Sequence, residues 1–599
     1  MCGIAGIIYQ QPSLNAIADI RKITELVAYR GPDGYGFWNK GNVYFGHRRL
    51  SIIDLTEAGA QPMEYNGYVI TYNGEVYNYL ELKASLEKLG YAFKTQCDTE
   101  VILAAYQCWG PGCLNRFNGM WSFAIYDPYK NLVFCSRDRF GVKPFYYLQQ
   151  QDKLVFGSEI KQLLPFVQNV KANEQALIHY LAFSITDNAD ESFFAGIKNL
   201  PGSHYLTYDL LSFKIEIKRY YSISVDSQVQ HMNYADALSE FKNHFNRSVA
   251  LRMRSDTEVG GCLSGGLDSS LVALTVARNH KNETPFNAFT AASIDPLQND
   301  APFAKLVADS LQLNWHLTTP AASNVSHDFT AVCTIMEEPV VTPSVFMQHY
   351  VMQKANECGL KVLLDGQGAD ESLLGYSRYI GALARQLKGV DKWRFLWQAK
   401  QQYGLDKSQL AVSFFYFSNW QLRKKYALLK LKGINRRYLN QVDNDYFRQL
   451  SEAYKDPLEL QKMEITSSQL PALLRYEDRN SMYFSIETRL PFLDWQLLEF
   501  NLSLPANFKI KNGWSKYPIR ESLNGQLPDE ITWRRNKIGF NAPDNIWVNA
   551  AKALQPGIKN SALLNQLFDN PLAVYNGKNG MLWKLANIAC WEKTFNVTI

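Results

Sequence analysis

The sequence is poor in cysteine: 9 of its 599 residues are Cys, and they lie far apart. It contains neither a CxxC pair nor a Cys/His spacing that suits zinc. Secreted domains held by disulfides and structural zinc sites depend on such arrangements. The cysteine pattern therefore argues against both and indicates a reducing compartment, so we expect a cytoplasmic protein.

Long apolar runs and a one-sided charge are also missing. The apolar stretch LAVSFFYF is less than half the roughly 18 residues that a helix needs to cross a bilayer. The 62 Lys and Arg residues nearly balance the 57 Asp and Glu residues, which leaves a net charge of +5. That balance gives no whole-molecule field suited to nucleic acid. We therefore expect small-molecule substrates, no membrane span and no nucleic-acid partner.

Two patterns of apolar residues follow each other along the chain. Residues 1–165 contain short apolar or alternating runs, such as YVITYNGEVYN and MWSFAIYD, which predict strands. The runs YLELKASLEKLG and TEVILAAYQCWG predict helices among them. Beyond about residue 235, short β-type runs alternate with longer helical ones, which predicts a doubly wound parallel sheet.

Cys2 is the first candidate for chemistry. If Met1 is removed, the thiol and a free α-amine with a pKa near ~8 belong to one residue, and the amine can accept the thiol proton. The alternative is that Cys2 is a small apolar residue buried in a terminal strand. Residues farther along the first part favour the chemical interpretation.

The segments GHRRLSIID, QP, YNGEVYN and CDTEVIL follow Cys2 in this order. Singly they are weak evidence, because Arg49 in a strand can be a surface residue and Asn73-Gly74 is often an ordinary hairpin turn. As a set they resemble the glutamine amidohydrolase domain of the N-terminal-nucleophile amidotransferases. The resemblance implies an α+β domain, an αββα sandwich, over residues 2–210.

By this resemblance, Cys2 attacks the side-chain amide of glutamine and releases ammonia through a thioester. It implies further roles in the same site: binding of the α-carboxylate by Arg49, binding of the α-amino group by Asp98, an oxyanion hole of Asn73 and Gly74, and orientation of the amino acid by Glu75. These residue types suit the roles, since a guanidinium pairs with a carboxylate and amide donors stabilise an oxyanion.

In the second part, SGGLDSS (Ser264–Ser270) follows a predicted strand and opens a predicted helix. Backbone N–H groups and hydroxyls can approach a phosphate there, although no Walker A motif is present. The glycines alone would fit an ordinary turn, but the whole heptad resembles the pyrophosphate loop of N-type ATP pyrophosphatases. The residues implied to bind ATP and pyrophosphate are Leu263, Ser264, Gly265, Gly266, Asp268, Ser269, Ser270 and Gly366.

A second loop, LLDGQGADESLLGY, also follows a predicted strand and places Asp370 and Glu371 beside the expected nucleotide. Mg²⁺ prefers a few carboxylates together with phosphate oxygens, so we predict Asp268 and Asp370 as its ligands. Without the first loop, Asp370 would be interpreted as a helix N-cap.

Two later segments, YEDRNSMYFSIETRLPFLD (Tyr476–Asp494) and WRRNKIGFNAP (Trp533–Pro543), extend the resemblance to the glutamine-hydrolysing asparagine synthetase family over nearly the whole chain. This implies a synthetase domain over residues 235–599, an α/β doubly wound ATP pyrophosphatase fold with extra helices. It also implies ATP and Mg²⁺ as cofactors, phosphate contact by Lys537, an internal ammonia passage with apolar lining and, by analogy, a homodimer.

The resulting hypothesis is an asparagine synthetase that converts aspartate, glutamine and ATP to asparagine, glutamate, AMP and pyrophosphate through a β-aspartyl-adenylate. One alternative is an amidotransferase for another carboxylate, such as a sugar acid or a secondary-metabolite precursor; another is a scaffold without catalysis. Gln367 bears on the acceptor, because family members often have there a glutamate that is a candidate base for the ammonia proton. A glutamine cannot take that proton, so either Glu371 or a phosphate replaces it or the acceptor is not aspartate, although many family members carry the same DGQGADE form.

Residues 380–450 are rich in aromatic and basic residues at helical spacing. Amphipathic helices with solvated cationic faces explain this segment more simply than an RNA site does.

Overall fold

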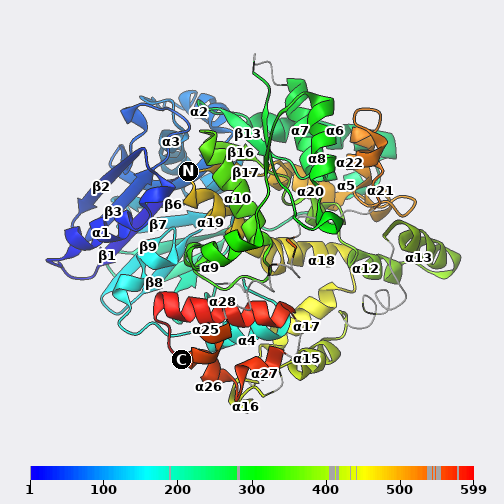
Figure 1. The fold of residues 1–599 in the computed structure, drawn as a ribbon. Coiled ribbons are helices and arrows are strands. Elements are labelled where there is room, and N and C mark those ends of the chain that lie inside the picture. Colours follow the sequence, from blue (N-terminus) through cyan, green and yellow to red (C-terminus); the bar gives the residue numbers. More distant parts are fainter. Residues whose placement is uncertain are drawn as a thin grey trace.

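The computed structural model describes residues 2–599 except 188–189, 280–283, 404–411, 413–416, 432, 440–441, 536–541, 544–546, 548–554 and 576–578. Its N-terminal part contains two antiparallel sheets, blue to cyan in Figure 1. In spatial order, the first sheet consists of β10 (Lys198–Asn199), β8 (Tyr146–Gln149), β9 (Lys153–Gly157), β1 (Gly3–Tyr9), β3 (Val43–Arg49) and β2 (Gly34–Lys40). The second consists of β12 (Ile215–Arg219), β11 (His204–Asp209), β7 (Leu132–Arg137), β6 (Gly119–Asp127), β5 (Tyr68–Val76) and β4 (Met63–Tyr65).

Side chains point alternately to the two faces of each sheet. One face packs against the other sheet and the opposite face packs against helices, which gives four layers. Ile4 and Ile8 of β1 join an apolar cluster between the two sheets, whereas Ile7 packs with the residues of α1 (Ala16–Glu25). On the second sheet, Ile70 packs against α2 (Tyr79–Glu87) and α3 (Asp98–Trp109). This alternation is the period of two that a strand imposes. The predicted αββα sandwich and both of its predicted helices are confirmed; the boundaries 2–210 and 235–599 stay predictions.

A parallel sheet forms the centre of the second part. Its order is β15 (Asn314–Thr318), β14 (Asn287–Ala291), β13 (Val259–Cys262), β16 (Val362–Leu364) and β17 (Glu487–Arg489). The order reverses direction between β13 and β16, so the predicted doubly wound topology is confirmed. Ligands of such sheets bind at the carboxyl ends of the strands at this switch point. The two predicted nucleotide loops both begin there.

Helices cover both faces of the parallel sheet. Leu364 packs on the side of α6 (Tyr234–Arg252), α7 (Leu267–Asn279) and α8 (Ala301–Leu311). Leu363 instead packs on the side of α10 (Ser344–Glu357). Because β16 is buried on both faces, its sequence is continuously apolar rather than alternating.

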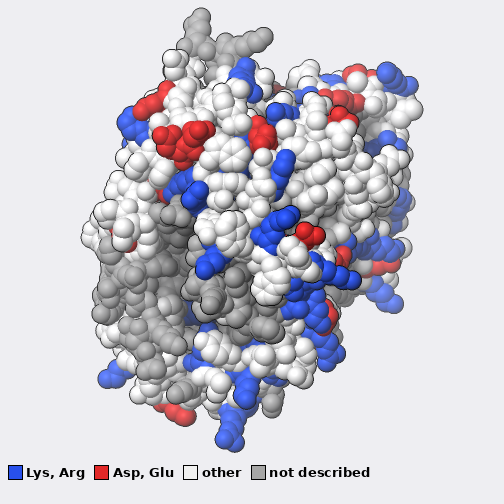
Figure 2. All heavy atoms as spheres, turned by 90° about the vertical axis from the view of Figure 1, so that its right-hand side faces the viewer, with Lys and Arg blue, Asp and Glu red and all other residues white. Residues whose placement is uncertain are grey.

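The remaining helices extend the second part. The aromatic and basic segment forms helices, as predicted: α12 (Tyr379–Gln386), α13 (Gly389–Tyr403), α15 (Trp420–Leu429), α16 (Arg436–Leu439) and α17 (Asn444–Ala453). On the face turned toward the viewer in Figure 2, other residues separate the Lys and Arg side chains into several groups. Within the described part of the chain, no helix has the length and apolar character that crossing a membrane requires.

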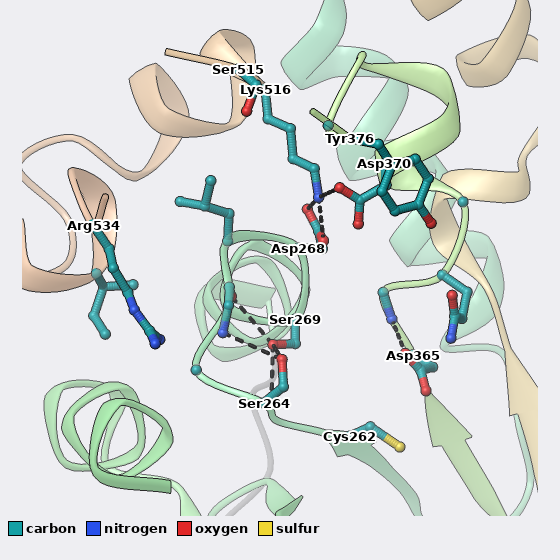
Figure 3. Close-up of a pocket in the computed structure, with 18 of the residues that line it drawn as sticks. Cys262, Ser264, Asp268, Ser269, Asp365, Asp370, Tyr376, Ser515, Lys516 and Arg534 are labelled. Atoms are coloured by element: carbon teal, nitrogen blue, oxygen red, sulfur yellow. Dashed lines mark hydrogen bonds and ion pairs between the residues drawn. The ribbon is translucent and has the colours of Figure 1, made fainter. Parts of the chain in front are cut away.

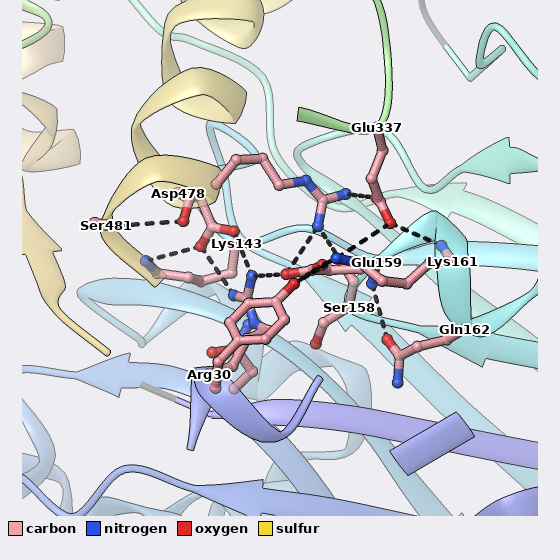
Figure 4. Close-up of polar contacts among 12 residues, drawn as sticks. Arg30, Lys143, Ser158, Glu159, Lys161, Gln162, Glu337, Asp478 and Ser481 are labelled. Atoms are coloured by element: carbon pink, nitrogen blue, oxygen red, sulfur yellow. Dashed lines mark hydrogen bonds and ion pairs between the residues drawn. The ribbon is translucent and has the colours of Figure 1, made fainter. Parts of the chain in front are cut away.

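A buried ion network joins the two parts around α19 (Leu470–Tyr483) (Figure 4). Arg30, which is fully buried, contacts Glu159 at 2.8 Å and Asp478 of α19 at 2.8 and 3.1 Å. Arg479 contacts Glu159 at 3.1 Å and Glu337 at 2.6 Å. Removing one partner of such a network leaves a buried charge uncompensated, which makes the arrangement of the two parts specific.

Candidate active site

A small cavity lies beside Cys2 at the start of β1, and most residues predicted for glutamine meet there. Its walls include Cys2, Arg49, Gly74, Glu75 and Asp98. Cys2 is buried, and burial raises the pKa of its thiol above the ordinary value. The thiol is therefore neutral at pH 7 and needs a base before it can act as a nucleophile.

Asn73 and Gly74 lie at the end of β5 nearest to Cys2. The Cys2 N–H donates to Asn73 Oδ1 at 3.0 Å, while Asn73 Nδ2 is buried and has no hydrogen-bond partner among the described residues. Gly74 has φ of +151°, and a Cβ there would lie 2.1 Å from the Met120 carbonyl oxygen. Only glycine fits this close approach. Asn73 does not line the Cys2 cavity, whereas Gly74 does, so the two residues lie next to Cys2 and their role as an oxyanion hole stays a prediction.

The two predicted substrate-binding charges face the same cavity. Arg49 ends β3, and its guanidinium donates to the carbonyls of Thr56 at 2.7 Å and of Asp54. Asp98 is the first residue of α3 and accepts from the Tyr72 hydroxyl at 2.8 Å and the Val76 amide at 2.9 Å. Arg49 of β3 offers a cation for the α-carboxylate of an amino acid, and Asp98 of α3 offers a carboxylate for its α-amino group.

The sequence prediction missed Glu487, which also lines the Cys2 cavity although it belongs to β17 of the parallel sheet. It is 1% exposed. Its signal in the sequence was a short charged segment, Glu487 to Arg489, flanked by the apolar residues Ile486 and Leu490, because a charge in a buried strand calls for a specific partner.

The second cavity, of about 820 Å³, lies at the switch point of the parallel sheet (Figure 3). Of the residues predicted to bind ATP and pyrophosphate, the lining contains Leu263, Ser264, Gly265, Gly266, Asp268, Ser269 and Gly366. Ser270 does not line it and is fully buried in α7. The volume lies within the range of ligand-binding clefts.

Hydroxyls and backbone amides converge in the first loop. Ser264 and Ser269 lie with their Oγ atoms 3.1 Å apart, and the Ser264 amide donates to Ser269 Oγ at 3.1 Å. Gly265 has φ of +70°, and a Cβ there would lie 2.4 Å from the Ala304 nitrogen. The loop therefore needs glycine to turn under α8, and it leads into the N-terminus of α7, where the helix dipole favours an anion.

Asp268 and Asp370, the predicted metal ligands, approach each other across the cavity. Lys516 lies between them, with Nζ 2.7 and 2.8 Å from the Asp268 oxygens and 2.6 Å from Asp370 Oδ1. Because both carboxylates contact the same lysine nitrogen, they are close enough to bind one metal ion together. With phosphate oxygens they would form the donor set that Mg²⁺ prefers, so these residues fit the predicted metal.

Lys516 was missed by the sequence prediction, which assigned phosphate contact to Lys537. Lys537 lies outside the described residues, so its role stays a prediction. Lys516 immediately precedes α22 (Tyr517–Leu523) and has φ of +51°. A cation at a helix N-terminus is opposed by the helix dipole, and that conflict was the available signal in SKYPIR.

Gln367 lines the nucleotide cavity, whereas Glu371 lies behind it. Glu371 is 1% exposed and accepts from the Tyr376 hydroxyl at 2.8 Å, and Tyr376 does line the cavity. Burial and the neighbouring Asp370 charge raise the pKa of Glu371 to about 7. A carboxyl group with a pKa of about 7 can accept a proton at neutral pH, and the Tyr376 hydroxyl connects Glu371 to the cavity.

The two cavities are linked by two neighbouring strands. Glu487 of β17 lines the Cys2 cavity, and β17 pairs with β16, which leads directly into Asp365 and Gly366 of the nucleotide cavity. The buried Glu477 of α19 interacts electrostatically with both Asp365 and Lys143. The predicted ammonia passage and its apolar lining stay predictions.

Comparison with known proteins agrees with this division. A glutamine amidotransferase domain family matches residues 1–221, and an asparagine synthase family matches residues 240–591. Asparagine synthetase [glutamine-hydrolyzing] 1 of Bacillus subtilis (strain 168) is 29% identical over 580 residues, which cover 92% of this chain and 88% of that protein.

Two further relatives show the breadth of the similarity. Asparagine synthetase [glutamine-hydrolyzing] 2 of the same organism is 31% identical over 561 residues, covering 90% of this chain and 72% of that protein. The amidase chyE of Penicillium rubens is 26% identical over 596 residues, covering 89% and 86%.

Proposed function

Because the chain belongs to the asparagine synthase family, we propose that it is a glutamine-dependent asparagine synthetase that activates aspartate with ATP. The observation that carries the proposal is the presence of two sites in one chain. One cavity combines a buried thiol with paired amino-acid-binding charges, and the other combines a phosphate loop with a bridged carboxylate pair. A carboxylate does not react with ammonia until it is activated, so each site supplies what the other lacks.

The first half-reaction takes place at Cys2. After removal of Met1, the α-amine belongs to the same residue as the thiol and can take the thiol proton, and the Asn73 Oδ1 atom that accepts from the Cys2 nitrogen would orient this amine. The thiolate attacks the carboxamide of glutamine, and ammonia leaves with a proton from the amine. Water then cleaves the thioester to glutamate. Asn73 Nδ2 and the Gly74 amide stabilise the oxyanion in both steps.

The second half-reaction takes place at the switch point. A carboxylate oxygen of aspartate attacks the α-phosphorus of ATP, pyrophosphate leaves, and ammonia then displaces AMP from the acyl group. Ser264, Ser269 and the amides at the start of α7 bind the leaving pyrophosphate, and Lys516 balances its charge. Mg²⁺, held by Asp268 and Asp370, would supply further charge neutralisation on the phosphates. Glu371 accepts the surplus proton of the attacking ammonia through Tyr376.

We expect the KM for glutamine to rise as the pH falls through about 6. Burial raises the pKa of Asp98 to about 6, against the opposing hydrogen bonds from Val76 and Tyr72. Above this pH the carboxylate is ionised and attracts the substrate ammonium; below it the group is neutral and that attraction is lost. Rates of glutamate release from about pH 5 to about pH 8 measure the effect. Asp98→Asn should show a high KM that stays flat over this range, and a flat wild-type KM would contradict the role of Asp98.

Acceptor identity is tested by pyrophosphate release. The purified protein is given ATP, Mg²⁺ and ammonium, together with one carboxylic acid at a time: aspartate, glutamate, β-alanine, a sugar acid or an aromatic acid. We expect release with aspartate and the appearance of asparagine and AMP in equal amounts. Release with another acid but none with aspartate would refute the asparagine synthetase assignment.

A second candidate, amidation of another carboxylate by the same chemistry, is favoured by Gln367. Family members often have a glutamate at this position as a candidate base, and its absence here leaves Glu371 to serve instead. One relative, from Penicillium rubens, is named an amidase and not an asparagine synthetase. The same screen distinguishes the two candidates.

A further inference from the structure

Arg489 lies behind the Cys2 cavity but comes from the other half of the chain. It is fully buried at the end of β17. Its Nη2 forms an ion pair with Glu75, and its Nε contacts Glu487 Oε1 at 2.6 Å. Its Nη1 donates to the carbonyls of Arg252 at 2.7 Å and Arg254 at 2.6 Å. Each guanidinium nitrogen is thus engaged, and the planar group is fixed in one orientation.

The two acidic partners of Arg489 form part of the Cys2 cavity wall from opposite sides of the interface. Glu75 is carried by β5 of the sandwich, and Glu487 by β17 of the parallel sheet. Burial raises the pKa of Glu75 well above its usual range. For Glu487 burial acts in the same direction, but the Arg489 charge prevails and lowers its pKa to about 2. Both carboxyl groups are contacted by the one Arg489 guanidinium.

The backbone of Arg489 reaches the other cavity. Its carbonyl accepts from the Asp365 amide at 3.0 Å, and Asp365 lines the nucleotide cavity. The same residue therefore anchors a loop of one site by its main chain and a wall of the other site by its side chain.

We propose that Arg489 is a positioning residue for glutamine hydrolysis, which holds Glu75 against the Cys2 cavity from the synthetase half and so makes the glutamine site a composite of both halves. The inference rests on the proposed hydrolysis of glutamine at Cys2. It differs from a purely structural ion pair in one respect: the Arg489 side chain acts on the glutamine pocket, whereas only its main chain contacts the nucleotide site. Loss of the side chain therefore raises the KM for glutamine more than it disturbs the nucleotide site.

The test compares Arg489→Met and Arg489→Lys with the wild type in two assays on the full chain. Glutamate release without ATP gives the KM and kcat for glutamine, and ammonium-dependent pyrophosphate release reports the synthetase site. We expect Arg489→Met to raise the KM for glutamine about ten- to a hundredfold, because Glu75 loses its partner. Ammonium-dependent release should stay within about twofold. Lysine keeps the charge without the planar fork, so Arg489→Lys should have an intermediate KM.

Arg475 offers a matched control. It is another buried arginine of the interface that contacts two carboxylates, Asp187 at 3.0 Å and Glu338 at 3.5 Å, and it lines neither cavity. Arg475→Met and Arg475→Lys should leave the KM for glutamine within about twofold, even where the Tm falls. If Arg489→Met does not fold, Arg489→Lys compared with Arg475→Lys decides the question.

Two results would overturn the inference: an unchanged KM for glutamine in the Arg489 variants, or an equal loss of both activities that parallels the fall in Tm. Failure of the proposed function looks different, because a wild-type protein that releases no glutamate from glutamine refutes the glutaminase assignment before any variant is made.

Discussion

Replacing Cys2 with alanine should abolish glutamine-dependent synthesis and leave ammonium-dependent synthesis intact. In the proposed mechanism the thiol is the nucleophile of the first cavity, and its removal should lower glutamate release by about 10³-fold or more, since loss of a covalent nucleophile removes the whole reaction path. The nucleotide cavity contains no atom of Cys2, so adenylation and attack by added ammonium should proceed as in the wild type. Amide product and pyrophosphate are measured with glutamine and with an ammonium salt as nitrogen donors.

Cys97 provides the control for this experiment. It is a second buried cysteine that lines the same cavity, at the position before α3. Cys97→Ala should retain glutamate release within about tenfold, because it removes one sulfur atom from the cavity wall and no nucleophile. Equal loss of glutamine- and ammonium-dependent synthesis in Cys2→Ala would contradict the division of labour between the two cavities.

Lys516→Met should show the opposite selectivity. We expect pyrophosphate release to fall by about 10²- to 10³-fold with either nitrogen donor, because the variant loses the cation that lies at the phosphate loop and leaves Asp268 and Asp370 facing each other. Glutamate release without ATP should stay close to the wild-type rate. Lys516→Arg keeps the charge but not its compact geometry, and we expect only partial recovery.

Lys509 and Lys537 complete the comparison. Lys509 is buried in α21 (Ala506–Lys509), donates to the Leu502 carbonyl at 3.1 Å and lines neither cavity, so Lys509→Met should keep pyrophosphate release. Lys537→Met tests the residue that the sequence resemblance selected. Pyrophosphate release that survives in Lys516→Met within about tenfold, but is lost in Lys537→Met, would return the phosphate-binding role to Lys537.

The glutamine site shows how far local motifs carry a prediction. Cys2, Arg49, Gly74 and Asp98 could be selected because each stands in a short segment whose residue types suit one chemical role, and the folded chain brings all four to one cavity. Glu487 and Arg489 could not be selected in this way. They act on that cavity from a strand more than 400 positions away, and nothing in SIETRLPF states which surface the strand will meet.

The nucleotide site repeats the contrast. The loop after β13 was recognisable because a glycine-rich turn between a strand and a helix is a local device for phosphate. Lys516 belongs to the same site but lies about 250 positions after that loop, and its contact with Asp268 depends on how α22 packs against α7. The family resemblance indicates Lys537 instead, because a motif is visible in the sequence, whereas a packing contact between distant segments is not.

The local elements could be predicted from the sequence: the period of two in the strands of the αββα sandwich, the apolar strands of a doubly wound sheet, and the glycine-rich turn that contains Gly265. These follow from backbone sterics and the burial of apolar side chains, which act over a few neighbouring residues. Folding is what brings Glu487 of β17 into the wall of the Cys2 cavity and Arg489 against Glu75, places Lys516 between two aspartates, and links the two cavities through the paired strands β16 and β17. Those outcomes depend on contacts between distant segments. A charged side chain is buried at low cost only where folding brings an oppositely charged partner to the same place.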